Sequence, residues 1–326
     1  MGPESTPGTE LGDARADSNP EHANGPRYNF VFCDHTAENV PAIVEQIKDC
    51  DIVAIEGVGK TTEERQGIES LANRLSRVAP DSPEAAQLLD RLRAHVSGAM
   101  EDLLSSLAGK GKTITLIDVD QDHPIYSLIT DAGNLLDYYA EAQISKPTPH
   151  LRNIVRDLVA DNAIIDQFRE AAVITQLQSM PQQGVEKETD VAVIEGKAHT
   201  PVYHAMGRAG YMVHRDFVAG DEDVAPPEKA HFSYMDRATR AERINPAWQP
   251  DKLTLNRIVL ETMIRGFTGD EFGATHMVEG LDDQTVEGIL AEVDETKMRV
   301  SIEGIDHQLQ AIKTLLKSKD LIDGAL

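Results

Sequence analysis

Short apolar runs alternate with longer amphipathic segments through most of this chain, and this alternation constrains the fold more than any other feature. Five runs have the length and composition of buried strands: Tyr28–Cys33, Ile52–Ile55, Thr113–Asp118, Val191–Glu195 and Gly210–Phe217. Helical spacing between them implies right-handed crossovers, so neighbouring strands should run parallel. We therefore expect an α/β fold with a mainly parallel sheet, helices on both faces and additional C-terminal helices.

The expected helices lie between and after these strands. They are Glu38–Lys48, about 62–107, about 124–142, about 148–178, Thr200–Arg208, 253–266 and 283–320. Proline cannot continue a helix because its ring clashes with the preceding turn, so Pro80 and Pro83 should divide 62–107 into two helices. The segment 219–250 contains DEDVAPPEKA and is expected to be an irregular excursion. The remainder of 28–326 should form a single domain.

The first 27 residues have a different composition from the rest of the chain. They are rich in Gly, Pro, Ser, Asp and Glu and nearly free of large apolar side chains. Such a segment cannot bury enough surface to offset the entropy of ordering, so we expect 1–27 to be a disordered acidic tail. It has no basic and apolar regions typical of a signal peptide, and no apolar run approaches the roughly 20 residues of a membrane span. We expect a cytoplasmic protein with no membrane partner.

Charge and cysteine content narrow the possible functions. The chain has 31 Lys and Arg against 55 Asp and Glu, a formal net charge of −24. Nucleic-acid binding needs clustered basic side chains for the phosphates, so no nucleic-acid partner is expected. Cys33 and Cys50 are the only cysteines. Two cysteines support neither a disulfide scaffold nor a Cys-rich zinc site.

Polar side chains follow four of the predicted strands. In an open α/β sheet the ligand binds beyond the carboxyl ends of the strands. Those ends read Cys33-Asp34-His35-Thr36, Glu56-Gly57, Asp118-Val119-Asp120 with His123 close behind, and Glu195-Gly196-Lys197-Ala198-His199. Imidazole and carboxylate groups bind Zn²⁺, Mn²⁺ or Fe²⁺, and an open coordination position would activate water. The alternative is purely structural, because an Asp after a strand often caps the next helix.

Two blocks of the chain resemble the TraB/Tiki/EreA–ChaN-like superfamily. Phe30–Gly57 (FVFCDHTAENVPAIVEQIKDCDIVAIEG) is similar to the superfamily's opening, in which a strand ends in a His motif and the next strand ends in a Glu. Val191–Phe217 (VAVIEGKAHTPVYHAMGRAGYMVHRDF) is similar to a later strand with its Gly-x-x-His turn, here ending at His199. Together the blocks cover about 55 residues. The first block departs from the pattern, because Phe32 stands where a Gly-x-x-His motif needs Gly.

This resemblance implies a divalent-metal-dependent hydrolase, since the superfamily includes metal-dependent peptidases and esterases that act on macrolides. It implies that His35, His199 and Glu56 are metal or catalytic positions, with Glu56 either binding the ion or accepting a proton from bound water. The ion would be Zn, Mn or Fe, and the substrate a small-molecule or peptide ester or amide. From the residues alone, we add Glu195 as a catalytic candidate and His123 as a metal ligand.

A competing interpretation rests on the GVGKTT loop. This stretch follows a strand, precedes a helix and resembles the deviant Walker A motif of ParA-type ATPases. Lys60 would then contact the β- and γ-phosphates, and Thr61 would bind Mg²⁺. Asp118 or Asp120, in a stretch that resembles the magnesium-binding strand of the same family, would act through the ion. Glu56 weakens this interpretation because its negative charge would lie beside the triphosphate.

A third interpretation is a non-catalytic binding or regulatory protein. In that case the His and Glu side chains at the strand ends should be dispersed, or held in unrelated hydrogen bonds. Convergence of these side chains on one site would favour an enzyme.

Overall fold

The computed structural model describes residues 25–33, 36–57, 60–186, 188–196, 199–218, 233–269, 271–301 and 304–322. Within these ranges five strands form one parallel sheet in the order β3-β2-β4-β1-β5. The strands are β1 (Arg27–Cys33), β2 (Ile52–Glu56), β3 (Thr113–Ile117), β4 (Asp190–Gly196) and β5 (Val213–Val218). Each of the five predicted strands is present, so the α/β class with a parallel sheet is confirmed.

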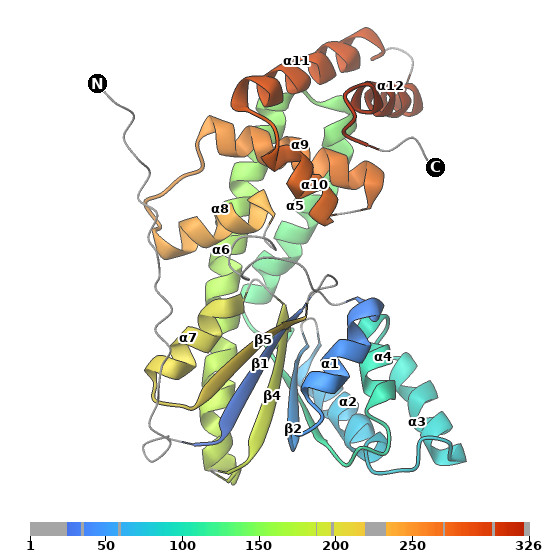
Figure 1. Ribbon diagram of the computed structural model, residues 1–326, viewed down its shortest axis with the longest axis vertical. Helices are drawn as coiled ribbons and strands as arrows, with labels where there is room; N and C mark the ends of the chain where they lie inside the picture. Colours follow the sequence, from blue (N-terminus) through green and yellow to red (C-terminus); the bar gives the residue numbers. More distant parts are fainter. Residues whose placement is uncertain are drawn as a thin grey trace.

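Helices cover both faces of this sheet (Figure 1). One face packs against α1 (Val40–Gln46), α2 (Thr62–Leu75), α3 (Pro83–Arg93) and α4 (Ala99–Ser106). The other face packs against the second half of α6 (Thr148–Ser179) and against α7 (Thr200–Arg208). Successive strand residues point to opposite faces. In β2, Val53 and Ile55 therefore join the first core, whereas Ala54 joins the second.

A layer of helices stands at the carboxyl edge of the sheet (Figure 1). It consists of α5 (Ile125–Ser145), the first half of α6, α8 (Tyr234–Ile244), α9 (Lys252–Thr268), α10 (Glu271–Glu279), α11 (Asp283–Arg299) and α12 (Ile305–Ser318). Helix α6 links this layer to the sheet: Leu151 and Leu158 lie in the core of the helical layer, and Val173 and Leu177 lie against the strands. The predicted additional C-terminal helices are thus confirmed.

Several predicted boundaries differ from the structure. Segment 62–107 holds three helices rather than two, because the chain turns at Gly98, whose φ of 59° favours glycine, before α4 begins. Segment 283–320 is likewise divided into α11 and α12. The predicted irregular segment 219–250 contains helix α8, which Ser233 and Asp236 start with a capping box; residues 219–232 lie outside the described part.

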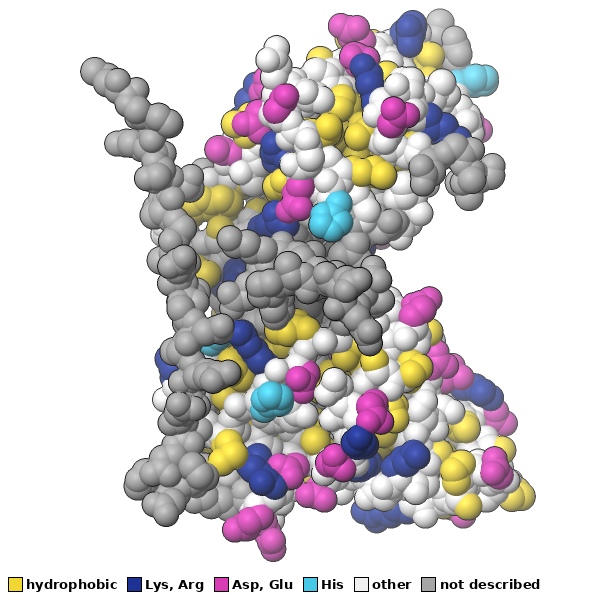
Figure 2. All heavy atoms as spheres, in the orientation of Figure 1, with side chains coloured by type: hydrophobic (Ala, Val, Ile, Leu, Met, Phe, Trp, Pro, Cys, Tyr) yellow, Lys and Arg dark blue, Asp and Glu magenta, His cyan; other side chains and the backbone are white. Residues whose placement is uncertain are grey.

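Other predictions are not tested by the structure. Residues 1–24 of the predicted tail lie outside the described part, and β1 begins at Arg27. That 28–326 forms a single domain also stays a prediction. Among the described helices, none combines the length and apolar character needed to cross a membrane. On the face shown in Figure 2, acidic and basic side chains are interspersed over both the sheet and the helical layer.

Candidate functional site

Charged side chains from three strand ends and from α6 meet at the carboxyl edge of the sheet. Glu56 ends β2, Asp118 follows β3, Glu195 is near the end of β4 and His199 directly precedes α7. The alternation along β2 and β4 directs Glu56 and Glu195 to the face covered by α6, where Arg169 is located. We call these five residues the strand-end cluster.

Arg169 joins the ends of two strands to α6. Its Nη2 contacts Glu56 Oε1 and lies 2.5 Å from Asp118 Oδ2, and its Nε lies 3.1 Å from both Asp118 oxygens. The planar guanidinium suits such forked pairing with carboxylates. The Asp118 side chain is 1% exposed and that of Arg169 is 15% exposed. Both charges are thus largely removed from water and depend on each other.

Asp118 has a strained backbone. Its φ of 129° lies in a region that non-glycine residues rarely adopt, at a cost of about 1–3 kcal/mol. Gln176 on α6 holds this conformation, because its amide accepts from Asp118 N at 3.0 Å and donates to Asp118 O at 2.8 Å. Asp118 Oδ1 in turn accepts from Val119 N at 2.6 Å. The strained residue is therefore fixed from both its backbone and its side chain.

His199 lies between two carboxylates. Its Nε2 is 3.7 Å from Glu56 Oε1, and its Nδ1 is 3.5 Å from Glu170 Oε1. The same Glu170 oxygen receives a hydrogen bond from Arg243 Nη1 on α8 at 2.6 Å. The helical layer thus reaches the imidazole through Arg243 and Glu170.

Gly196 connects β4 to Glu56. Its N–H donates to Glu56 Oε2 at 2.8 Å, and a Cβ at this position would lie 3.4 Å from the same oxygen and 3.7 Å from His199 Cδ2. These are ordinary van der Waals distances, so a Cβ would be accommodated at this position. The contact that Gly196 contributes to the cluster is therefore the hydrogen bond from its backbone N–H.

Glu195 is the least compensated member of the cluster. The residue is 1% exposed, and its Oε2 has no hydrogen-bond partner among the described residues. Burial raises the pKa of Glu195 to about 8, although the neighbouring His199 opposes this. For His199, burial lowers the pKa, but the hydrogen bond to Glu170 and the charge of Glu56 outweigh it and raise the pKa to about 9. Both groups therefore hold protons near neutral pH.

The structure brings together three of the five predicted site residues: Glu56, Glu195 and His199. His123 has a different local role, because its Nδ1 accepts from Ile125 N at 3.2 Å and its ring packs 6.3 Å from that of Phe168. His35 lies outside the described residues; Cys33, two positions earlier, pairs with Gly196 in the sheet. Among the described residues, no three His, Cys, Asp or Glu side chains are grouped closely enough for a metal site. That the predicted residues bind a metal ion stays a prediction.

The groups expected to bind a phosphate make other contacts. Lys60 Nζ donates to the carbonyl of His95 at 2.6 Å, and Thr61 caps α2 in a capping box with Glu64. Asp120 pairs with Arg65 and accepts from Thr62 Oγ1 at 2.9 Å. Residues 58 and 59 lie outside the described part. The phosphate-loop interpretation stays a prediction that these contacts do not favour.

The sequence reasoning missed Arg169, Glu170 and Arg243. Arg169 could have been found, because it lies one turn before Val173 and two before Leu177, on the helix face that packs against the sheet. A charged residue that continues an apolar stripe needs a buried partner. The link from Arg243 to Glu170 has no comparable local signal, since the two residues are 73 positions apart in the sequence.

Comparisons with known proteins add no family to this geometry: no family model, no curated protein and no solved structure matches the chain. The resemblance of Phe30–Gly57 and Val191–Phe217 to the TraB/Tiki/EreA–ChaN-like superfamily therefore stays a prediction. The chemistry of the strand-end cluster is the basis for assigning a function.

Proposed function

We propose that this chain is a divalent-metal-dependent hydrolase of an ester or amide, with the strand-end cluster as its active site. One observation carries the proposal: Glu56, Glu195 and His199 come from separate elements and meet in one buried, charged site. In a non-catalytic protein we would expect these side chains to be dispersed or held in unrelated hydrogen bonds, and their convergence favours an enzyme. Glu195 Oε2 adds support, because it has no hydrogen-bond partner among the described residues and a buried acceptor without a donor is rare in a purely structural role.

Among the described residues, one pair of donors has a spacing that a divalent ion could bridge. Two ligands about 2.1 Å from a tetrahedral Zn²⁺ are roughly 3.4 Å apart, close to the 3.7 Å between His199 Nε2 and Glu56 Oε1. Glu170 on the Nδ1 side is the kind of partner that orients a metal-binding imidazole. His199 and Glu56 would hold the ion, and His35 would supply a further ligand. Arg169 contacts the same Glu56 oxygen, so it would share that carboxylate with the ion.

The bound ion would polarise the substrate carbonyl and lower the pKa of a water molecule. The chain's own residues supply the rest. Glu195, with its pKa raised by burial to about 8, can give or accept a proton near neutral pH. Arg169 keeps its charge at all physiological pH values and can donate to an oxygen that becomes negative. Arg243 and Glu170 keep the His199 imidazole oriented toward Glu56.

The test is hydrolysis by the zinc- or manganese-loaded chain of small p-nitrophenyl esters and aminoacyl p-nitroanilides. We expect Glu195→Gln and His199→Ala to lower kcat/KM by about 10²-fold or more. His150→Ala, at an exposed histidine on α6 beside Tyr138, is the matched control and should retain full activity. Equal activity in all four proteins, or no hydrolysis by the loaded wild type, would contradict the proposal.

A further inference from the structure

A cavity of about 330 Å³ lies beside the strand-end cluster, between α5, α6, α8 and α9. Arg169 and Asp166 of α6 line it, and Arg169 also binds Glu56 and Asp118. A molecule in this cavity would therefore touch the cluster through the guanidinium. The volume is at the lower end of the roughly 300–1,000 Å³ typical of small-molecule sites.

The floor of the cavity is apolar. It is formed by side chains of α5, α6 and α8: Ile129, Ala132, Leu136, Leu158, Ile165 and Met235. Leu136 is 53% exposed, so part of this apolar side chain is in contact with water. An apolar ligand would cover it, and the removal of this surface from water would favour binding.

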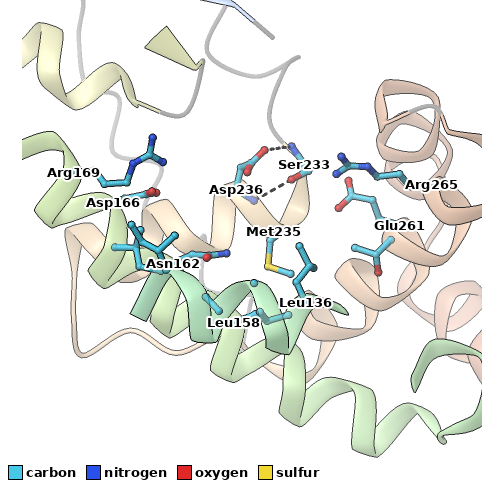
Figure 3. Close-up of a pocket in the computed structure, with 15 residues that line it drawn as sticks. Leu136, Leu158, Asn162, Asp166, Arg169, Ser233, Met235, Asp236, Glu261 and Arg265 are labelled. Carbon is cyan, nitrogen blue, oxygen red and sulfur yellow. Dashed lines mark hydrogen bonds between the residues drawn. The ribbon is translucent and has the colours of Figure 1, made fainter. Parts of the chain in front are cut away.

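The two sides of the cavity are charged. In Figure 3, Arg169 and Asp166 lie on one side and Arg265 and Glu261 on the other, with Met235, Leu136 and Leu158 between them. The sides are thus separated by the apolar floor, and only the side with Arg169 adjoins the strand-end cluster. An elongated molecule would be oriented by whichever charged group it carries.

The cavity's carboxylates already serve the fold. Both oxygens of Glu261 accept from the first backbone N–H of α8, at 3.1 and 2.9 Å, and Asp236 Oδ2 accepts from Ser233 N at 3.2 Å. Asp166 lies 3.5 Å from Arg243. Arg265 is exposed, and a guanidinium has five N–H donors, so it can bind an anion in addition to its contacts with the protein. The far side thus carries one guanidinium and one carboxylate, and Arg265 is the member of this pair that can donate to a ligand anion.

We infer that this cavity binds an elongated, mainly apolar ester or amide that carries a carboxylate at the end remote from the scissile bond. Arg265 binds the carboxylate and the apolar floor holds the chain. The scissile group then lies on the side of Arg169, the member of the strand-end cluster that lines the cavity. This inference rests on the proposed function and names its substrate class.

The test is isothermal titration of the full-length chain with octanoate and with 1-octanol, in the presence of a chelator. Octanoate supplies an apolar chain with one terminal carboxylate, and octanol supplies the chain alone. We expect Leu136→Trp, which fills the cavity, to weaken octanoate binding by about tenfold or more. Arg265→Gln should weaken octanoate binding by about fivefold and leave octanol binding unchanged. Ile164→Trp on α6 and Arg299→Gln on α11 are controls at exposed residues that do not line the cavity, and should bind octanoate normally.

The inference is overturned if wild type does not bind octanoate, or if Leu136→Trp binds it as tightly as wild type does. Equal losses of octanoate and octanol in Arg265→Gln would overturn the assignment of the carboxylate to Arg265. Because the titration contains chelator, it does not depend on the proposed metal. Octanoate binding with the expected variant pattern, but without any hydrolysis by the metal-loaded chain, would uphold the cavity and reject the proposed function.

Discussion

Charges are buried in two regions of this molecule, and the two regions satisfy them differently. In the helical layer several charges complete a helix end, whereas Arg243 on α8 pairs with Glu170. Glu261 accepts from the first N–H of α8, Asp294 accepts from the first N–H of α6, and Lys297 donates at 2.8 Å to the carbonyl at the end of α5. The signs agree with the helix dipole, which favours anions at N-termini and cations at C-termini.

In the strand-end cluster the charges face one another. Glu56 and Asp118 share Arg169, while Glu195 is left with an oxygen that has no partner among the described residues. Burial of a charge therefore does not by itself indicate a functional site. What distinguishes the cluster is that its carboxylates exceed the cations that face them, which a proton or a metal ion would correct. Four substitutions, one of them with a matched control, test this contrast.

The largest expected effect is that of Arg169→Met. Removing the guanidinium leaves Glu56 and Asp118 buried without their cation, and we expect the free energy of unfolding to fall by about 3–5 kcal/mol. Urea unfolding at pH 7 without metal measures it. Arg74→Met removes the exposed pair with Glu84 and should cost at most about 1 kcal/mol. A loss below 1 kcal/mol for Arg169→Met would mean that the cluster is not held together by this charge.

Neutralising one glutamate in each region should change the free energy of unfolding by a smaller amount, and the change should have opposite signs in the two regions. Burial raises the pKa of Glu195 to about 8, so the folded chain holds a proton that the unfolded chain has lost. Wild-type stability therefore falls as pH rises from about 4.5 to 8, and the full cost of the ionised carboxylate is present above pH 8. At pH 9, without metal, Glu195→Gln should be more stable than wild type by about 1–2 kcal/mol.

Glu261→Gln should be less stable than wild type by about 1 kcal/mol under the same conditions, because it removes an anion from the start of α8. Chemical unfolding of both variants at pH 9 makes the comparison. If both substitutions destabilise the chain equally, Glu195 is as well compensated as Glu261 and the contrast between the regions fails.

The smallest expected change is in the pH dependence of the free energy of unfolding, and it follows from Lys297→Met. Burial lowers its pKa from 10.5 to about 8, although Asp294 opposes this. The cost of burying the ammonium is fully present below pH 8 and is relieved as pH rises toward 10.5, so this group makes stability increase with pH. Lys297→Met removes that dependence. The difference in unfolding free energy between variant and wild type should shrink by an amount on the order of 1 kcal/mol from pH 8 to pH 10. A constant difference would show that Lys297 is charged throughout.

The strands and their polar ends could be predicted from local sequence, because a buried parallel strand is a continuous apolar run and the residue that ends it is polar. Glu56 and Glu195 were found in this way. His123 has the same kind of position, yet its ring serves the start of α5. The sequence cannot separate these outcomes, because in both cases a polar residue lies within a few positions of a strand end.

The partners of the cluster could not be predicted in the same way. Arg169 lies in the middle of a long helix, and its contacts depend on how α6 crosses the sheet. Helix α8 was missed because the acidic, proline-containing stretch before it dominated the composition of the segment, although Ser233 and Asp236 form a capping box. Arg243 then reaches Glu170 only through the packing of α8 on α6. Contacts of this kind arise from tertiary packing, which a single sequence does not reveal.

We propose above that the strand-end cluster holds a divalent cation. The most direct test is elemental analysis of the chain, purified without chelator and reloaded with zinc or manganese, beside His199→Ala and the control His150→Ala. We expect about one ion per chain in wild type and in His150→Ala, and a clear loss in His199→Ala. No bound metal in reloaded wild type, or the same metal content in His199→Ala, would contradict it.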